Sequence, residues 1–399
     1  MDPRFDILPD RKKSLSVKWG VYGPDVLPMW VADMDFKSPE PVIQALQKEV
    51  DLGVFGYAYD KDEFKKILVK RLDDLYQWKI TPKDILLIPG IVTGLNQVAH
   101  MFSKDGGQAI VQTPIYPPFL SVPGNAKLTR VNNPLTWLSD GTYEIDFEGF
   151  ESAITNQTRV LFLCNPHNPV GRVFQKAELE RLAEICLRYN VLICSDEIHC
   201  DLVYPGNKHI PIASLSSDIA KNSITMMAPS KTFNIPGLQC SFAVVQNPDL
   251  RVKLEHAGEG LTGWVNLMGL VAGKAAYKGG QAWLKDLMVY LQGNRDFLFE
   301  FVNQNLPGVR MAKPEGTYLA WLDCREAGIV GNPYIYFLQS ARVALNDGKA
   351  FGEEGDGFVR LNFGCPRSML EDALLRMKAA LELPEKVVKP TGYVDPFAH

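Results

Sequence analysis

Short runs that are apolar at nearly every position recur through the middle of the chain and most strongly limit its fold. Strands that are covered on both faces of a sheet have this pattern. Helical patterns lie between several of the runs, as in residues 176–189, where apolar residues recur at helical spacing. We therefore predict an α/β fold with a largely parallel sheet flanked by helices. The six runs are residues 85–88, 109–112, 160–163, 191–194, 224–227 and 242–245.

The two ends of the chain differ from this central part. Residues 1–45 are rich in proline and aromatic residues, whereas the chain from residue 282 onward begins with a long helical pattern. Two short strand patterns follow that helix, at residues 317–321 and 358–361. We predict that residues 1–45 and 282–399 form a small α+β domain beside a large domain of residues 46–281.

The composition excludes several classes of function. Charged residues make up 22% of the 399, the formal net charge is −4, and no long basic run is present, so nucleic acid and anionic membranes are not favoured as partners. No apolar run approaches the roughly 20 residues that span a bilayer, and the first residues lack a signal-peptide pattern. The seven cysteines show no CxxC spacing and are expected to be reduced thiols in a cytoplasmic protein. No metal site is expected, because Cys194, His199 and Cys200 fit no common ligand spacing.

Lys231 lies just beyond the buried run at 224–227, in the sequence Ala-Pro-Ser-Lys-Thr-Phe. Poor solvation at such a position favours the neutral amine. A neutral amine is a nucleophile that can form a Schiff base with a carbonyl group. The alternative is an ordinary surface lysine at the start of a loop.

Polar residues follow other runs, and each has a structural alternative to its chemical role. Asp196 could cap a helix or keep a pyridinium nitrogen protonated. Asn168 could belong to a simple turn or donate a hydrogen bond to a phenolate. Tyr116 could fill the core or stack on a flat ring. The turn from Gly90 could be only a turn, or its N–H groups could hold a phosphate at a helix N-terminus. Arg360 could pair with a structural carboxylate or with the carboxylate of a substrate.

Together these motifs resemble a known family. Asn-Pro-His-Asn-Pro-Val-Gly at 165–171, Ser-Asp-Glu-Ile-His at 195–199, Ala-Pro-Ser-Lys-Thr-Phe-Asn at 228–234 and Phe-Val-Arg-Leu-Asn-Phe-Gly at 358–364 occur in the order and spacing of fold-type-I pyridoxal 5′-phosphate enzymes. The resemblance covers nearly the whole chain. Residues 27–36 and 55–59 make it most similar to the cystathionine β-lyase (MalY/PatB-type) branch. The resemblance implies a mostly parallel seven-stranded sheet and pyridoxal 5′-phosphate as cofactor.

The resemblance also implies roles for single residues. Lys231 would attach the cofactor covalently, Asp196 would pair with its ring nitrogen, and Tyr116 would stack on the ring; these three are the predicted catalytic residues. Residues that resemble positions reaching the neighbouring subunit's cofactor imply a homodimer with composite active sites. The predicted cofactor-binding residues are Lys231, Asp196, Asn168, Tyr116, Ile91, Val92, Ser230, His199 and, from the neighbouring subunit, Tyr57 and Asn266. The predicted substrate-binding residues are Arg360, Asn168, Ala32 and Asp33.

Two positions depart from the pattern of aminotransferases. His199 stands where they carry a tyrosine, and Gln239 stands where they often carry an arginine that binds phosphate. Both departures fit the lyase branch. Without the arginine, the helix N-terminus and hydroxyl donors must hold the phosphate. We interpret His199 as a hydrogen-bonding group that supports the site, in preference to a base.

The predicted activity follows from these assignments. The amine of Lys231 would act as general base at Cα, and a thiolate on Cβ would leave by β-elimination. The substrates would be L-cystathionine and related S-substituted L-cysteines, and the products a thiol, pyruvate and ammonia. The same residues also support transamination of small or aromatic amino acids, which remains an alternative. A regulatory binding role is a second alternative.

Overall fold

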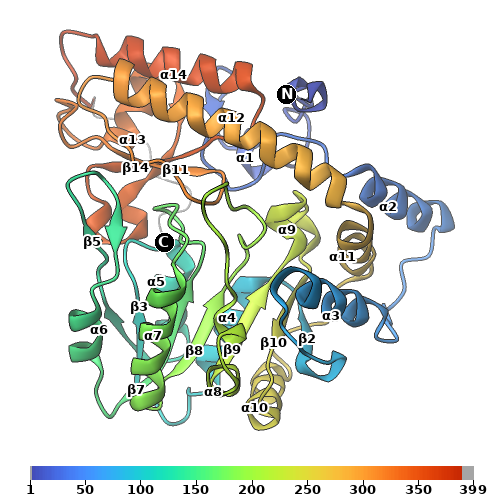
Figure 1. The fold of residues 1–399 in the computed structure, drawn as a ribbon. Helices are drawn as coiled ribbons and strands as arrows, with labels where there is room; N and C mark the ends of the chain where they lie inside the picture. The colour runs from blue at the N-terminus through green and yellow to red at the C-terminus, as the bar shows by residue number, and fades with distance from the viewer. Residues whose placement is uncertain (1, 389–399) are drawn as a thin grey trace.

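The computed structural model describes residues 2–388, in which a central sheet with helices on both faces lies beneath a second group of helices and strands (Figure 1). The sheet has seven strands in the order β2-β10-β9-β8-β7-β3-β4. Each of the six apolar runs forms one of them, and the seventh is the edge strand β4. The strands are β2 (Ile85–Ile88), β10 (Ser241–Val244), β9 (Ser223–Met227), β8 (Leu192–Asp196), β7 (Thr158–Cys164), β3 (Gln108–Val111) and β4 (Thr129–Asn132).

The sheet is mostly parallel, as predicted. Pairing is parallel from β9 through β8, β7 and β3 to β4, and only β10 runs against its neighbours β9 and β2. The carboxyl ends of the other six strands therefore meet at one edge. In open α/β sheets this edge is where ligands bind.

Apolar side chains on both faces of the sheet explain why the central strands are apolar throughout. On one face, Phe162 packs in a core with residues of α4 (Ile91–His100), α5 (Pro117–Asn125) and α10 (Pro248–Gly258). On the other face, Leu161 and Leu163 pack against α6 (Phe147–Ala153) and α7 (Lys176–Arg188). The helix predicted at 176–189 is α7, and its buried residues include those that recur at helical spacing in the sequence.

The second group of elements comes from both ends of the chain. Its three-stranded antiparallel sheet contains β11 (Leu319–Asp323), β14 (Phe358–Asn362) and β13 (Asn346–Asp347). The helices α12 (Gln281–Asn305) and α14 (Arg367–Leu381) cross the top of the view in Figure 1. Near the N-terminus, β1 (Leu27–Pro28) pairs with β12 (Val343–Ala344), which ties the two ends of the chain together. The division into two domains stays a prediction, and its last residues, 389–399, lie outside the described part.

The remaining elements are short or peripheral, apart from two helices that pack on each other, α2 and α11. All seven cysteines are buried with free thiols. Among residues 2–388, no helix combines the length and apolar character needed to cross a membrane. The remaining helices and strands are α1 (Val17–Gly20), α2 (Glu40–Leu52), α3 (Glu63–Tyr76), β5 (Thr136–Trp137), β6 (Tyr143–Glu144), α8 (Ser217–Lys221), α9 (Pro229–Thr232), α11 (Leu267–Gly279) and α13 (Pro333–Tyr336), with a π-helix at Phe337–Ala341 and 3-10 turns at Pro3–Asp6, Pro82–Asp84, Ile212–Ser214, Pro236–Leu238, Gly348–Phe351 and Glu353–Gly355.

Candidate active site

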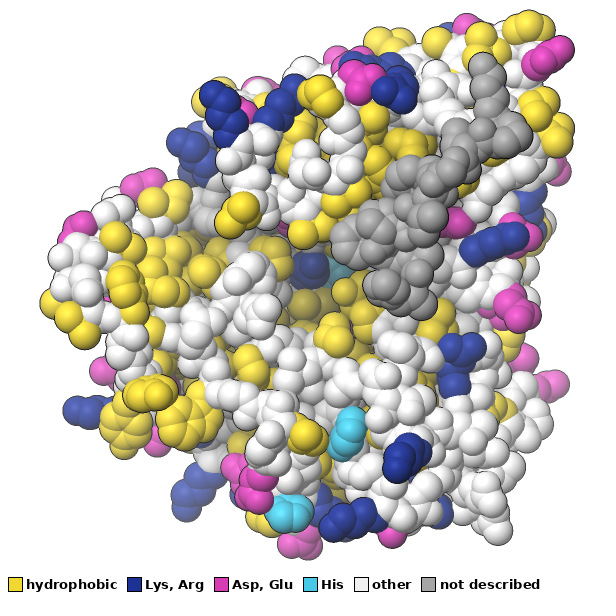
Figure 2. Space-filling view, turned by 180° about the vertical axis from the view of Figure 1, so that it is seen from behind, with side chains coloured by type: hydrophobic (Ala, Val, Ile, Leu, Met, Phe, Trp, Pro, Cys, Tyr) yellow, Lys and Arg dark blue, Asp and Glu magenta, His cyan; other side chains and the backbone are white. Residues whose placement is uncertain are grey.

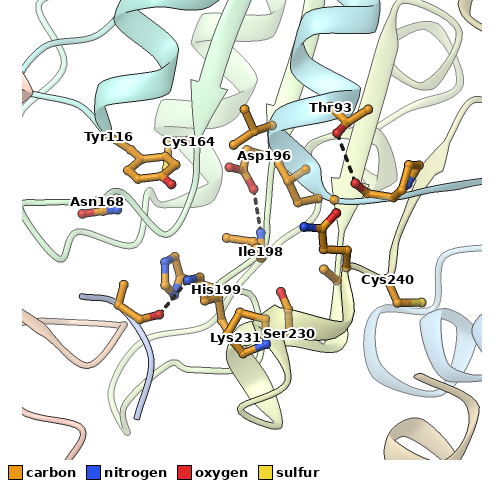
Figure 3. Close-up of a pocket in the computed structure, with 18 residues that line it drawn as sticks. Thr93, Tyr116, Cys164, Asn168, Asp196, Ile198, His199, Ser230, Lys231 and Cys240 are labelled. Atoms are coloured by element: carbon orange, nitrogen blue, oxygen red, sulfur yellow. Dashed lines mark hydrogen bonds between the residues drawn. The ribbon is translucent and has the colours of Figure 1, made fainter. Parts of the chain in front are cut away.

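A cavity of about 360 Å³ lies at the carboxyl edge of the parallel strands (Figure 3). Strand ends supply most of its polar residues, since the residues after β2, β3, β7, β8 and β9 converge there. Ala32, from the N-terminal part of the chain, closes the cavity opposite them. The lining residues are Ala32, Pro89, Gly90, Ile91, Val92, Thr93, Tyr116, Cys164, Asn168, Asp196, Ile198, His199, Ala228, Ser230, Lys231, Pro236, Gln239 and Cys240.

Lys231 lies in the cavity, because the short helix α9 turns the chain directly after β9. Its Nζ donates a hydrogen bond of 2.6 Å to the carbonyl oxygen of Ala32. Burial lowers the pKa of Lys231 to about 8; the charge of Arg360 acts in the same direction, and those of Asp33 and Asp196 oppose it. A substantial fraction of this amine is therefore neutral near pH 8, and the alternative of an ordinary surface lysine does not describe it.

Asp196 is the last residue of β8 and is buried at the cavity wall. Its Oδ1 accepts a hydrogen bond of 3.0 Å from the N–H of Ile198, within a turn and not at the start of a helix. Burial raises the pKa of Asp196 to about 7, and the Ile198 N–H and the cation of Lys231 work against this rise. A cationic group bound beside this carboxylate would lower its pKa and be held by it.

Arg360 projects from β14 and is buried without a carboxylate partner among residues 2–388. Its hydrogen bonds go to neutral oxygens: Asn168 Oδ1 at 2.9 Å, Trp30 O at 3.1 Å and Asn346 Oδ1 at 2.6 Å. Its Nε has no partner among the described residues. Burial lowers the pKa of Arg360 to about 10, so the side chain stays charged at neutral pH. The alternative in which Arg360 pairs with a structural carboxylate therefore does not hold among the described residues.

The N-terminus of α4 forms one end of the cavity. Gly90 precedes the helix with a φ of 100°, a backbone conformation that favours glycine. The N–H groups of the first turn, from Ile91, Val92 and Thr93, have no partner within the helix, so they can bind an anion. Ser230 also lines the cavity and carries a hydroxyl. These groups could hold a phosphate without the arginine that aminotransferases often carry.

His199 and Tyr116 lie along the walls between these groups. Burial lowers the pKa of His199 to about 3, and the cations of Lys231 and Arg360 act in the same direction, so the imidazole is neutral. Its Nδ1 is buried and has no hydrogen-bond partner within residues 2–388, which leaves it available to a ligand. The backbone N–H of Tyr116 donates to the carbonyl of Asn168 at 3.1 Å, which keeps these two residues adjacent (Figure 3).

Four predicted site residues are not among those that line the cavity: Arg360, which reaches it only through its bond to Asn168, and Asp33, Tyr57 and Asn266. The carboxylate of Asp33 points away and binds Arg11 through a bond of 2.7 Å. Tyr57 and Asn266 line a separate surface hollow with Trp264, and Tyr57 is 96% exposed. A role for the last two therefore requires a second subunit.

Some lining residues escaped the sequence analysis. Thr93 could have been expected from its place in the first turn of α4, whereas Ile198 and Cys240 are apolar residues without a distinguishing pattern. Tyr318 was also missed, and its hydroxyl donates to the carbonyl of Ala32 at 2.8 Å. Within residues 2–388, no three His, Cys, Asp or Glu side chains gather so that they could hold a metal ion.

The residues of the cavity fit the cofactor that the sequence motifs imply. An amine, a buried carboxylate, an imidazole with an unpartnered nitrogen and a helix N-terminus face one volume. These are the partners that an aldehyde, a ring nitrogen, a ring hydroxyl and a phosphate require.

Comparison with known proteins agrees with this fit. The chain matches the family described as "Aminotransferase class I and II" over residues 24–377. "Cystathionine beta-lyase PatB" of Bacillus subtilis (strain 168) is 40% identical over 386 residues, covering 94% of this chain and 99% of that protein. The solved structure of a candidate aminotransferase from Clostridium difficile 630 with bound pyridoxal 5′-phosphate (PLP) is 40% identical in sequence. It superposes with a TM-score of 0.91 and covers 95% of this chain and 99% of that chain. A PLP-bound C-S lyase from Staphylococcus hominis is 33% identical with a TM-score of 0.88, covering 94% and 98%.

Proposed function

We propose that this chain, which belongs to the class I and II aminotransferase family, is a pyridoxal 5′-phosphate-dependent carbon–sulfur β-lyase. Its substrates are L-cystathionine and related S-substituted L-cysteines, which it cleaves to a thiol, pyruvate and ammonia. The observation that carries the proposal is the cavity in which Lys231, Asp196 and the first turn of α4 face one volume, with the uncompensated guanidinium of Arg360 behind Asn168. The relatives named as cystathionine β-lyase and C-S lyase support the choice of reaction.

The cavity residues divide the work of holding the cofactor. When bound, pyridoxal 5′-phosphate supplies an aldehyde that condenses with amines and a ring that withdraws electrons from Cα. Lys231 would provide the amine for covalent attachment, and Asp196 would hold the ring nitrogen in its protonated form. Ile91, Val92 and Ser230 would hold the phosphate. Asn168 and His199 are available to the ring hydroxyl, and Tyr116 to the ring face.

Arg360 and Lys231 act on the substrate. The buried guanidinium of Arg360 binds the α-carboxylate, which orients the amino acid and fixes the position of Cα. The free amine of Lys231 is placed to take the proton from Cα, because its pKa of about 8 leaves a substantial fraction neutral near that pH. Loss of that proton would allow a thiolate on Cβ to leave.

The charges of the cavity disfavour a substrate whose side chain carries an unbalanced negative charge. Lys231 is the single cationic side chain among the described residues that line it, because burial keeps His199 neutral. The nearby cation Arg360 is assigned to the α-carboxylate. The side-chain carboxylate of aspartate or glutamate would have no cation of its own, whereas the distal carboxylate of L-cystathionine is accompanied by the ammonium group of the same substrate. The apolar Ala32, Ile198, Pro236 and Cys240 suit its thioether.

The dimer is part of the same proposal. Large apolar side chains lie on the surface around the hollow that Tyr57 and Asn266 line. Figure 2, which views the molecule from the side opposite to Figure 1, shows apolar side chains beside the central hollow of that side. A monomer rarely exposes so many large apolar groups together, so a second copy of the chain is the expected cover. The exposed residues of this patch are Val54, Phe55, Tyr57, Tyr59, Leu261 and Trp264.

Location of the protein in the cytoplasm stays a prediction made from the sequence.

One comparison tests the proposed activity. The protein is incubated with L-cystathionine, and pyruvate and free thiol are measured. The same preparation is then given L-aspartate with 2-oxoglutarate. We expect the larger kcat/KM for L-cystathionine. A larger value for the aspartate pair would replace the lyase with an aminotransferase.

A further inference from the structure

The backbone carbonyl of Ala32 accepts hydrogen bonds from two side chains, those of Lys231 and Tyr318. Lys231 Nζ donates to it at 2.6 Å and the hydroxyl of Tyr318 donates to it at 2.8 Å. A carbonyl oxygen has two lone pairs, so it can accept both bonds at once. The position and direction of this one oxygen therefore decide where the amine of Lys231 lies when it is free.

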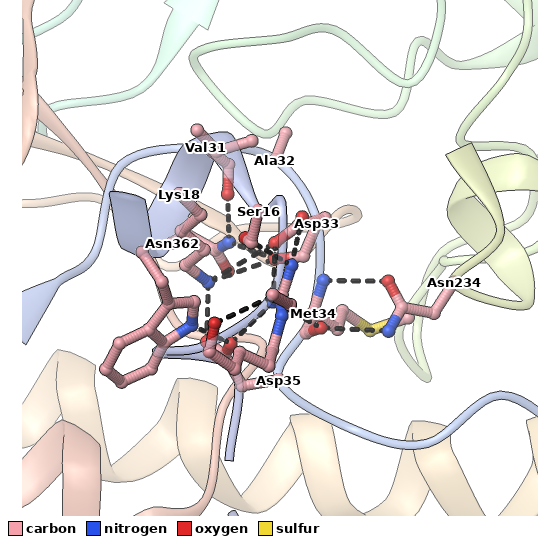
Figure 4. Close-up of polar contacts among 12 residues, drawn as sticks. Ser16, Lys18, Val31, Ala32, Asp33, Met34, Asp35, Asn234 and Asn362 are labelled. Carbon is pink, nitrogen blue, oxygen red and sulfur yellow. Dashed lines mark hydrogen bonds and ion pairs between the residues drawn. The ribbon is translucent and has the colours of Figure 1, made fainter. Parts of the chain in front are cut away.

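Asn362 fixes the direction of that carbonyl. Its Nδ2 donates to the carbonyls on both sides of Ala32, to Val31 O at 2.5 Å and to Asp33 O at 2.7 Å (Figure 4). Its own Oδ1 accepts the N–H of Gly364 at 2.8 Å, which sets the orientation of the carboxamide. Asn362 is fully buried. With both neighbouring peptide groups held, the Ala32 peptide has little freedom to turn.

Four charged residues hold the same segment through ion pairs, and we call them the N-terminal ion cluster: Arg11, Lys18, Asp33 and Asp35. Figure 4 labels Lys18, Asp33 and Asp35. Lys18 Nζ lies 2.6 Å from Asp35 Oδ2, and both side chains are completely buried. Arg11 binds both carboxylates at 2.7 Å. Lys18 also donates to the carbonyl of Asp33 at 3.1 Å. Buried ion pairs stabilise a fold weakly, because desolvation offsets their attraction. Here they bind residues 33 and 35 to Arg11 and Lys18.

We propose that Asn362 and the N-terminal ion cluster are positioning groups that aim the Ala32 carbonyl at the amine of Lys231. The carbonyl then holds the amine whenever it is not bonded to the cofactor. This inference rests on the proposed function. When the neutral amine takes a proton from Cα, the resulting ammonium donates to Ala32 O, and the same amine can later release that proton. Asn362 lies two residues after Arg360, so one face of β14 serves both the carboxylate and the lysine.

The proposal predicts the sign of a change in proton affinity. The charged groups whose electrostatic influence reaches Lys231 are the anions Asp33 and Asp196 and the cation Arg360, although the carboxylate of Asp33 points toward Arg11. Neutral His199 and Tyr318 complete its surroundings. A hydrogen bond accepted by Ala32 O favours the ammonium form. Loss of a correctly aimed carbonyl should therefore lower the pKa of the amine, and removal of the competing donor Tyr318 should raise it.

The test uses the full-length chain freed of cofactor. The rate of covalent attachment of pyridoxal 5′-phosphate is followed by absorbance across pH, since only the neutral amine attacks. We expect the midpoint of this profile to fall by about one pH unit in Asn362→Leu, the order of one hydrogen bond to a charged group. In the reconstituted enzyme the same variant should lower kcat more than it changes KM.

Asn294→Leu is the matched control. Asn294 is equally buried, and its Nδ2 also donates to two backbone carbonyls, Phe363 O at 3.1 Å and Cys365 O at 2.8 Å. Among the hydrogen bonds of the described residues, none joins Asn294 to residues 31–35. It should lose comparable thermal stability and keep the midpoint of the wild type. Equal shifts in both asparagine variants would reduce Asn362 to a structural residue and overturn the proposal.

Tyr318→Phe decides the question if Asn362→Leu does not fold, because it removes one hydroxyl and leaves the ion cluster intact. Its midpoint should rise, and an unchanged or lowered midpoint would overturn the proposal. A wild-type chain that forms no covalent bond with pyridoxal 5′-phosphate would instead refute the proposed function itself. Attachment in the wild type with an unmoved midpoint in Asn362→Leu would refute only the positioning role.

Discussion

Arg360→Gln separates recognition of the substrate carboxylate from every other property of the site. The guanidinium is buried, bonded only to neutral oxygens, and has one N–H without a partner among the described residues. A carboxylate would be the first anion to reach it. Glutamine is shorter and neutral, and it can replace at most one of the two charged bonds that a bidentate contact supplies.

The expected loss follows from these contacts. A hydrogen bond to a charged group contributes about 1.5–3 kcal/mol, so replacing a bidentate pair with one neutral bond should cost about 3 kcal/mol, or roughly 100-fold in affinity. The variant should also lose some stability. Burial lowers the pKa of Arg360 to about 10, an unfavourable contribution of about 3 kcal/mol. Its removal offsets only part of the loss of three hydrogen bonds from a charged donor, each worth about 1.5–3 kcal/mol.

The assay compares two ligands that differ only in the carboxylate. L-Alanine has no leaving group on Cβ and should act as an inhibitor, and ethylamine is its counterpart without the carboxylate. In Arg360→Gln the inhibition constant of L-alanine should rise roughly 100-fold, whereas that of ethylamine should hardly change. Equal losses for both ligands would refute the assignment, since they would show general damage to the cavity. Arg360→Lys keeps the charge without the fork and should give an intermediate loss for L-alanine.

Three further predictions concern the cofactor and the assembly. The rate of covalent attachment of pyridoxal 5′-phosphate should be half-maximal near pH 8, because burial lowers the pKa of Lys231 to about 8 and only its neutral amine attacks. A midpoint above pH 10 would indicate a solvated lysine. Lys231→Ala should leave no cofactor that borohydride can fix to the protein. Asp196→Asn should still bind cofactor but slow turnover by roughly 100-fold or more, since an amide cannot stabilise a buried cation; near-normal rates would leave Asp196 a turn-forming residue. Inactive Lys231→Ala mixed with impaired Tyr57→Phe should regain partial activity in hybrid dimers, and no recovery despite verified subunit exchange would place Tyr57 at its own site.

The sequence predicted the central sheet well because burial on both faces leaves a direct trace in composition. Each strand from β7 to β9 is buried at nearly every position, so apolar runs located all three. The edge strand β4 has no such trace. Its residues 129–132 are mostly exposed and polar, and only parallel pairing with β3 makes it a strand. Strand number could therefore come only from the family resemblance, not from pattern.

Site residues could be predicted from the sequence where they lie at the end of a strand. Residues whose position depends on tertiary contacts could be predicted less well. Lys231 and Asp196 each directly follow or end a strand that the apolar pattern located, which is why their convergence could be expected. Asp33 was assigned to the substrate from the family resemblance, but its side chain points to Arg11 and Lys18. No local pattern gives that direction, since the segment is neither helix nor strand.

The cavity concentrates polar groups that folding alone would not leave unpaired. A buried donor or acceptor without a partner costs about 1–3 kcal/mol, and Arg360 Nε and His199 Nδ1 both lack one among the described residues. Asn362, two residues along β14 from Arg360, has each of its polar atoms engaged. The strand therefore pairs a fully satisfied side chain, suited to holding backbone in place, with an incompletely satisfied one, suited to binding a ligand. This contrast on one strand is a physical reason to assign Asn362 to positioning and Arg360 to recognition.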